Sequence, residues 1–294
     1  MKSEFINFGP VHLEIRDLDR SLRFWRDLVG LHPLEATETL AALGVDGVPL
    51  VVLHRAATRP VQRGYSGLFH VALHLPSEPE LARMVVRVRS SGHRFGASDH
   101  VVAKSLYLSD PDGIGLEIAY ETPERVRSYR WDEGVGEPVV IDAEGRRRRG
   151  VEPLDLQEVL AKLAGSDIAG PLPPGTIVGH LHLQVGDLDA SHRFYRDVVG
   201  LVPNLYAPWA GYADLGTGGL VAHRIALNTW QGAGVPSRPV GGAGMRSFTV
   251  RFQSPERIRA AVARMGDAES RKDEYLARDP DGNVMVMLGG HPDA

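Results

Sequence analysis

A chain of 294 residues with 43% hydrophobic side chains is long enough to bury one large core or two of ordinary size. Its net charge of -4 gives no overall basic field, which argues against nucleic acid or an anionic membrane as a partner. It has no cysteine, which excludes disulfides, thiolate metal ligands and a cysteine nucleophile. The lack of a signal-like or bilayer-length apolar run favours a soluble, cytoplasmic protein.

The first module predicted along the chain opens with an alternating strand at residues 11–15. Asp17 then has the position of a helix N-cap, and the helix is expected to end at Gly30. The apolar residues of this helix recur on one face: Leu22, Trp25 and Leu28. Further strands are expected at 40–46 and 50–55.

A second module starts with the alternating strand FHVALHL at residues 69–75. A helix is predicted at 78–91, where four apolar residues share one face: Leu81, Met84, Val85 and Val88. Two strands close the module, at 105–110 and 115–120. Each of the two modules therefore has a βαβββ pattern.

Residue types in the second module suit a non-haem metal. His70 lies on its first strand, and Glu117 follows the Asp-Pro-Asp-Gly turn at 110–113 by four residues. A carboxylate inside the apolar run around Glu117 needs a partner, and a metal is preferred over an arginine or a backbone group. Two imidazoles and one carboxylate can hold Fe(II) and leave positions for substrate and O₂. A second imidazole must then come from elsewhere in the chain.

Residues 122–176 differ in composition, being rich in proline, glycine and arginine. The amphipathic stretch at 154–165 predicts one helix in this segment. The run Arg146–Arg149 is interpreted as an exposed loop. We therefore predict that 122–176 is a linker with one helix between two domains.

The second half of the chain repeats the first, with module three starting at the strand 179–185 and module four at the strand 246–252. Residues 17–31 and 187–201 agree at eleven of fifteen positions, and the turn at 109–118 returns at 278–287. Such a repeat indicates a duplicated architecture. We predict an α+β fold, a tandem duplication of paired βαβββ modules, with an N-terminal domain at 1–121 and a C-terminal domain at 177–294.

The DLDxSxxFYxxxxGL openings and DPDGxxxE closings resemble the vicinal oxygen chelate superfamily, which includes glyoxalase I, bleomycin-resistance proteins and extradiol dioxygenases. The segments at 67–76, 97–118 and 223–230 look most like the catechol 2,3-dioxygenase branch. The resemblance implies a metal held in a trough made by two modules. One module supplies a His seven residues before the Asp of DLD and an assisting His. The other supplies a His, a Glu and a Tyr ten residues before the Glu.

The four modules differ in how many of the implied metal-binding and assisting residues they contain. Module one has prolines at both of its positions, Pro10 and Pro49. Module four carries none of the implied side chains, having Ser247, Leu276 and Val286. Module two has all three of its residues, His70, Tyr107 and Glu117, and module three has both of its histidines, His180 and His223. One complete set therefore requires modules two and three to share a trough, with modules one and four as a metal-free pair.

The resemblance implies roles for these residues. The metal ligands are His70, Glu117 and His180. His223 assists the chemistry of oxygen and protons, Tyr107 holds a substrate oxygen, and His100 is a second proton-handling group. Three further histidines on the strands remain ambiguous: His12, His74 and His182. His12 would replace the missing ligand if modules one and two shared the site instead.

The implied function is a metal-dependent extradiol ring-cleaving dioxygenase that acts on a small catechol-type aromatic with O₂. Fe(II) is the preferred metal, with Mn(II) or another divalent ion as alternatives. An apolar pocket for the ring is expected from three aromatic residues, Tyr206, Trp209 and Trp230. Two other functions stay open: a metal-free small-molecule-binding protein of bleomycin-resistance type, and a glyoxalase-type lyase or isomerase, whose sites usually carry two acidic ligands. A homo-oligomer is one alternative for its assembly.

Overall fold

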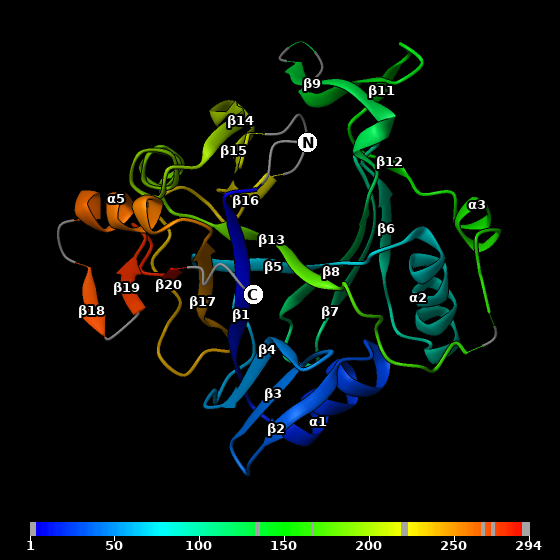
Figure 1. Ribbon diagram of the computed structural model, residues 1–294, viewed down its shortest axis with the longest axis horizontal. Helices are drawn as coiled ribbons and strands as arrows, with labels where there is room; N and C mark the ends of the chain where they lie inside the picture. The colour runs from blue at the N-terminus through cyan, green and yellow to red at the C-terminus, as the bar shows by residue number, and fades with distance from the viewer. Residues whose placement is uncertain are drawn as a thin grey trace.

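The structure is a computed structural model that describes residues 4–132, 134, 136–165, 167–218, 223–265, 268–271 and 274–289. Two large mixed sheets and one small three-stranded sheet make up the described chain, with short helices on their flanks (Figure 1). Within these ranges, no helix is long and apolar enough to cross a membrane. The predicted α+β class with repeated βαβββ modules is confirmed.

Modules one and four share the eight-stranded sheet. Module one contributes β1 (Ile6–Ile15), β2 (His32–Ala36), β3 (Leu40–Val45) and β4 (Val48–Arg55). Module four contributes β17 (Gly244–Phe252), β18 (Glu269–Arg271), β19 (Glu274–Arg278) and β20 (Val284–Gly289). The strand order is β18-β19-β20-β17-β1-β4-β3-β2. At the junction β1 and β17 run antiparallel, and His12 pairs with Ser247.

Modules two and three share the nine-stranded sheet. Module two contributes β5 (Gly67–His74), β6 (Gly96–Asp99), β7 (Ala103–Ser109) and β8 (Gly115–Glu121). Module three contributes β13 (Ile177–Gln184), β14 (Val202–Ala207), β15 (Tyr212–Gly216) and β16 (His223–Asn228). The strand order is β12-β6-β7-β8-β5-β13-β16-β15-β14. At the junction β5 and β13 run antiparallel, which is the pairing that the complementary ligand losses predict.

Each module places helical turns after its first strand. These are α1 (Leu18–Leu22) with the π-helical η1 (Arg23–Leu28), α2 (Glu78–Ser91), α4 (Leu188–Arg193) with the π-helical η3 (Phe194–Val199), and α5 (Pro255–Met265). The carboxylates of Asp17 and Asp187 cap α1 and α4, each accepting a backbone N–H three residues on. Helix α2 has the predicted bounds and ends at Gly92, whose φ of 70° is a conformation that glycine adopts without strain. A short turn η4 (Pro208–Ala210) joins β14 to β15.

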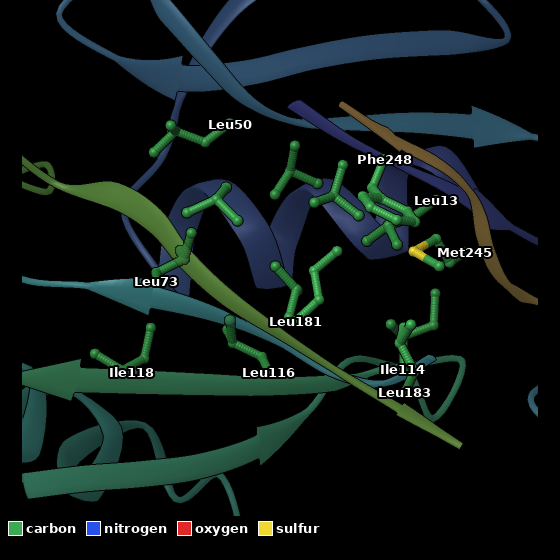
Figure 2. Packing of buried hydrophobic residues seen from close by; sticks show 14 of the residues in the cluster. Leu13, Leu50, Leu73, Ile114, Leu116, Ile118, Leu181, Leu183, Met245 and Phe248 are labelled. Carbon is green, nitrogen blue, oxygen red and sulfur yellow. The ribbon is translucent and has the colours of Figure 1, made fainter. Parts of the chain in front are cut away.

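The main core lies between the two large sheets (Figure 2). Leu13 and Phe248 enter it from the eight-stranded sheet, and Leu181 enters it from the nine-stranded sheet. Because strand side chains alternate between faces, Leu181 in the core places its neighbours His180 and His182 on the opposite face. That opposite face lines a cavity. The burial of the core thus sets the direction in which the histidines of β13 point.

Residues 122–176 contain more regular structure than the single predicted helix. They form η2 (Pro123–Arg125), β9 (Val126–Asp132), β10 (Glu137–Asp142), β11 (Arg147–Arg149), β12 (Glu152–Pro153) and α3 (Leu156–Leu160). Strands β9 to β11 make the small sheet, at the top of Figure 1. Only α3 falls in the stretch where a helix was predicted.

The interpretation of Arg146–Arg149 as an exposed loop is wrong for three of its four residues, which form β11. Acidic side chains pair with the guanidinium groups along this strand. Arg148 Nη2 lies 2.6 Å from Glu152 Oε2, and Arg149 pairs with Glu137. The charge of the arginine run is therefore locally neutralised by acidic side chains.

The large sheets cut across the duplicated halves, since each sheet takes one module from residues 1–121 and one from 177–294. The boundaries at 121 and 177 therefore describe the duplication. As a division into separate domains they stay a prediction.

Candidate metal centre

Three neighbouring strands position the predicted metal ligands. Ala72 on β5 pairs with Glu117 of β8 on one side and with His180 of β13 on the other. His70 lies two residues before Ala72 and therefore points to the same face of the sheet. The register of the sheet thus brings two imidazoles and one carboxylate together around the small side chain of Ala72.

The donor atoms of these ligands converge. Glu117 Oε2 lies 2.9 Å from His70 Nε2 and 3.2 Å from His180 Nε2, and the two nitrogens are 3.4 Å apart. Ligand atoms at about 2.1 Å from one octahedral ion lie about 3 Å from each other, so this spacing fits a shared divalent metal. Each of the three residues is at most 6% exposed. Among the described residues this is the one His and carboxylate cluster with such geometry.

The charges of the cluster also suit a cation. Burial by itself would raise the pKa of Glu117, but the imidazoles of His180 and His70 hold that pKa well below its usual range. Burial lowers the pKa of His180 well below its usual value, so this ring is neutral and keeps a lone pair. Ser105 Oγ donates a 2.6 Å hydrogen bond to Glu117 Oε1. The other oxygen, Oε2, is the one that faces the histidines.

Tyr107 and His100 form a pair beside the cluster. Tyr107 lies opposite Glu117 across β7 and β8, and its ring centroid is 5.7 Å from that of His70. The Tyr107 hydroxyl is 2.7 Å from His100 Nε2, while His100 Nδ1 is 3.1 Å from the carbonyl oxygen of Gly150. A carbonyl only accepts, so a neutral His100 carries its hydrogen on Nδ1 and accepts at Nε2 from Tyr107. Burial and the charge of Glu117 raise the pKa of Tyr107 well above its usual value.

His223 lies on the other side of His180. The ring centroids of these two histidines are 4.4 Å apart, and His223 Nδ1 is 3.8 Å from Asp214 Oδ2. Burial lowers the pKa of His223, although the nearby carboxylates of Asp214 and Glu117 act in the opposite direction. The structure therefore gathers all six predicted site residues around one space.

The ambiguous histidines fall into two places. His182 lies on the site face of β13, where its Nε2 accepts a 2.9 Å hydrogen bond from the Asn228 side chain. His74 lies on β5, and its Nε2 is 2.9 Å from His180 Nδ1. His12 lies in the other sheet, where its Nδ1 is 2.9 Å from His54 Nε2. His12 is therefore no substitute ligand for the cluster.

The sheet of modules one and four has no equivalent cluster in its described residues. Its register places Ser247 opposite Val284, as His70 lies opposite Gly115, and Leu276 opposite Val286, as Tyr107 lies opposite Glu117. The positions predicted to have lost their ligands are therefore the structural counterparts of those that kept them.

The cluster opens into a cavity of about 1100 Å³. Its aromatic lining comes from both modules and from the small sheet: Phe69, Tyr107, Tyr129, Trp131, Tyr212 and Trp230. Of the three predicted pocket aromatics, Trp230 lines the cavity. The prediction is wrong for Trp209, which packs against Trp131, and for Tyr206, whose hydroxyl bonds to Asp189.

Comparison with known proteins identifies the relationship. The family model described as the Glyoxalase/Bleomycin resistance protein/Dioxygenase superfamily matches residues 8–118 and 177–288. The chain belongs to this superfamily. A curated member, the catechol-2,3-dioxygenase of Bacillus subtilis (strain 168), is 31% identical over 293 residues, which are 97% of this chain and 98% of the relative.

Solved structures support the fold. Glyoxalase I from Zea mays aligns with a TM-score of 0.56 at 16% identity, over 97% of this chain and 92% of that protein. The cppA protein from Streptococcus pneumoniae TIGR4 aligns with a TM-score of 0.55 at 11% identity, over 98% and 99%. At such identities the likeness concerns the fold alone.

Proposed function

We propose that this protein is an extradiol ring-cleaving dioxygenase that acts on a catechol-type aromatic and O₂. The observation that carries the proposal is the buried cluster of His70, Glu117 and His180, with one carboxylate and two imidazoles. The 31% identical catechol-2,3-dioxygenase supports the same reaction class. Fe(II) is the proposed metal, and Mn(II) or another divalent ion is the alternative.

The three ligands would occupy one part of the coordination shell. A bound Fe(II), held by His70, Glu117 and His180, would supply the Lewis acidity and the electron-transfer capacity that ring cleavage by O₂ requires. The carboxylate of Glu117 offsets one positive charge of the ion. Ser105 fixes the rotation of that carboxylate through its hydrogen bond to Oε1.

Side chains around the cluster would handle protons. The Tyr107 oxygen gives its own hydrogen to His100 Nε2, so its lone pairs can accept the hydroxyl of a catechol. His223, with Nδ1 near Asp214, would hold or release a proton at Nε2 toward the reacting atoms. Phe69, Tyr212 and Trp230 would exclude water and orient the aromatic ring.

The composition of the cluster separates this proposal from the two alternatives. A glyoxalase-type site is expected to carry two acidic ligands, whereas the described cluster has one carboxylate. A metal-free binding protein gives no reason for a buried carboxylate to face two imidazole nitrogens within 3.2 Å.

Anaerobic purification followed by metal analysis and addition of catechol with air tests the proposal. We expect about one divalent ion per chain and a yellow ring-cleavage product. His70→Ala and His180→Ala should each lose the ion and the product, because one ligand comes from each half of the chain. His54→Ala, in the other sheet, is the control and should keep both.

Two results would count against the enzyme. Catechol binding without metal or turnover would favour a binding protein. Loss of the ion in His70→Ala but not in His180→Ala would contradict the site shared between modules two and three.

A further inference from the structure

His74 occupies a position behind the proposed metal ligands. It is four residues after His70 on β5, points to the same face, and is 6% exposed. Its Nε2 is 2.9 Å from His180 Nδ1, the nitrogen that does not face Glu117. Its Nδ1 is 3.4 Å from Glu121 Oε1. His74 thus lies between a metal-ligand ring and a second carboxylate.

The chemistry of these neighbours favours one arrangement of the ring hydrogens when a metal is bound. An ionised carboxylate only accepts, so the His74 nitrogen beside Glu121 favours carrying the hydrogen. A neutral imidazole has one N–H, which leaves His74 Nε2 as an acceptor. With a metal ion on His180 Nε2, the hydrogen of the neutral His180 ring would be on Nδ1, and His74 Nε2 would accept it. His180 Nε2 would then have no hydrogen, and its lone pair would face the ion shared with Glu117 and His70. Without an ion, the 3.2 Å contact of His180 Nε2 with Glu117 Oε2 favours a hydrogen on Nε2, so His74 and Glu117 compete for the tautomer of His180.

Glu121 is itself held in place. Arg224 Nη1 lies 3.1 Å from Glu121 Oε1, and the Nε of the same arginine donates a 2.9 Å hydrogen bond to Glu4. Arg224 is only 5% exposed, whereas the side chain of Glu121 is 35% exposed, so the ion pair lies at the edge of the buried region. The chain of contacts therefore runs from the cluster through His180, His74 and Glu121 to a buried arginine.

Gly179 makes room for this arrangement. A Cβ added to Gly179 would lie 2.1 Å from Cγ of His74, well inside contact distance. The His74 ring therefore packs directly over the backbone next to His180. A side chain at residue 179 must displace the ring, which gives an independent way to disturb His74 without changing it.

We propose that His74, oriented by Glu121, is a positioning residue that fixes the ring and the tautomer of His180 for metal binding. The inference rests on the proposed metal site. It assigns His74 no contact with substrate. The sequence leaves this histidine ambiguous, and neither the family match nor the relative assigns it a role.

Binding of Mn(II) to the metal-free full chain, measured by calorimetry, tests the inference without any turnover. His74→Phe keeps a ring but has no acceptor, and we expect its dissociation constant for Mn(II) to rise about tenfold to a hundredfold. His74→Gln has a side-chain oxygen that can accept from His180 Nδ1, so it should recover part of the affinity. Glu121→Gln and Gly179→Ala should each weaken binding.

His93→Phe is the matched control, because His93 does not line the cavity, and it should bind Mn(II) as the wild type does. NMR of ¹⁵N-labelled histidine reports which ring nitrogen carries the hydrogen. In the metal-free chain Glu117 favours a hydrogen on His180 Nε2 and His74 favours one on Nδ1, so we expect a larger fraction of His180 with the hydrogen on Nδ1 in the wild type than in His74→Phe. A merely structural role for His74 would change the melting temperature and leave this tautomer signal alone.

The outcomes separate the two proposals. Wild-type affinity in His74→Phe, or equal weakening in His74→Gln and His74→Phe with an unchanged tautomer, would overturn the role of His74 alone. If His74→Phe fails to fold, wild-type affinity in both Glu121→Gln and Gly179→Ala would overturn it. No Mn(II) or Fe(II) binding by the wild type would instead contradict the metal centre.

Discussion

His223 shows how neighbouring histidines can serve different purposes. Its ring lies 4.4 Å from that of His180, yet it is no member of the donor cluster around Glu117. Its side chain is 27% exposed, against 7% for His180, and it lines the cavity. A histidine that faces the substrate space without joining the ligands is suited to proton transfer.

Replacement of His223 by glutamine tests whether this residue serves proton transfer rather than metal binding. We expect His223→Gln to bind Mn(II) within about twofold of the wild type, because it removes no ligand. Its kcat for catechol cleavage should fall by about 10²- to 10⁴-fold, the usual contribution of a general acid or base. Calorimetry and steady-state oxygen consumption measure the two quantities. An unchanged kcat, or lost Mn(II) binding, would contradict the role of His223.

The sequence predicts the ligands better than the residues that support them. His180 could be found because it lies seven residues before Asp187, a local spacing. Ser105 and His74 could not be assigned, because their partners lie 12 and 106 residues away. Those contacts depend on how β7 pairs with β8 and on the pairing of β5 with β13. The alternation along a strand shows which face each residue takes, but it does not show which strand lies beside it.

The small sheet of β9 to β11 could not be predicted from the composition of residues 122–176, which is typical of a linker. It brings Trp131 to the cavity, where the indole stacks near Tyr212 with an interplanar angle of 22° and a centroid distance of 6.3 Å. It also precedes Gly150, whose carbonyl orients His100. The sequence analysis does not include Trp131 among the pocket aromatics, because Trp131 reaches the cavity only through the fold of a segment that is predicted as a linker.

Truncation of Trp131 tests the contribution of this sheet to substrate binding. We expect Trp131→Ala to raise KM for catechols about three- to tenfold, since an aromatic contact contributes about 0.5–1.5 kcal/mol beyond its buried area. The kcat should change little, because Trp131 is not among the ligands or the proposed proton-handling groups. Arg130→Ala, which alters the neighbouring exposed residue, is the control. A lower kcat with an unchanged KM in Trp131→Ala would argue against a role of Trp131 in substrate binding.

At the scale of the whole molecule, the sheet of modules two and three carries the proposed ligand set, and the described residues of the sheet of modules one and four do not. Each half supplies one module to each sheet, so no half of the chain contains a complete set. The spacing of His70, Glu117 and His180 predicts this exchange because neither half is complete by itself. What spacing does not predict is the convergence of the donor atoms to 2.9–3.4 Å, which follows from the pairing of Ala72 with residues of both neighbouring strands.

Anomalous diffraction at the manganese edge, from crystals of the full chain grown with Mn(II), tests this architecture most directly. The account predicts one strong peak per chain, at bonding distance from His70 Nε2, His180 Nε2 and Glu117 Oε2. A peak between modules one and four, or one that contacts ligands of a single half, would contradict it.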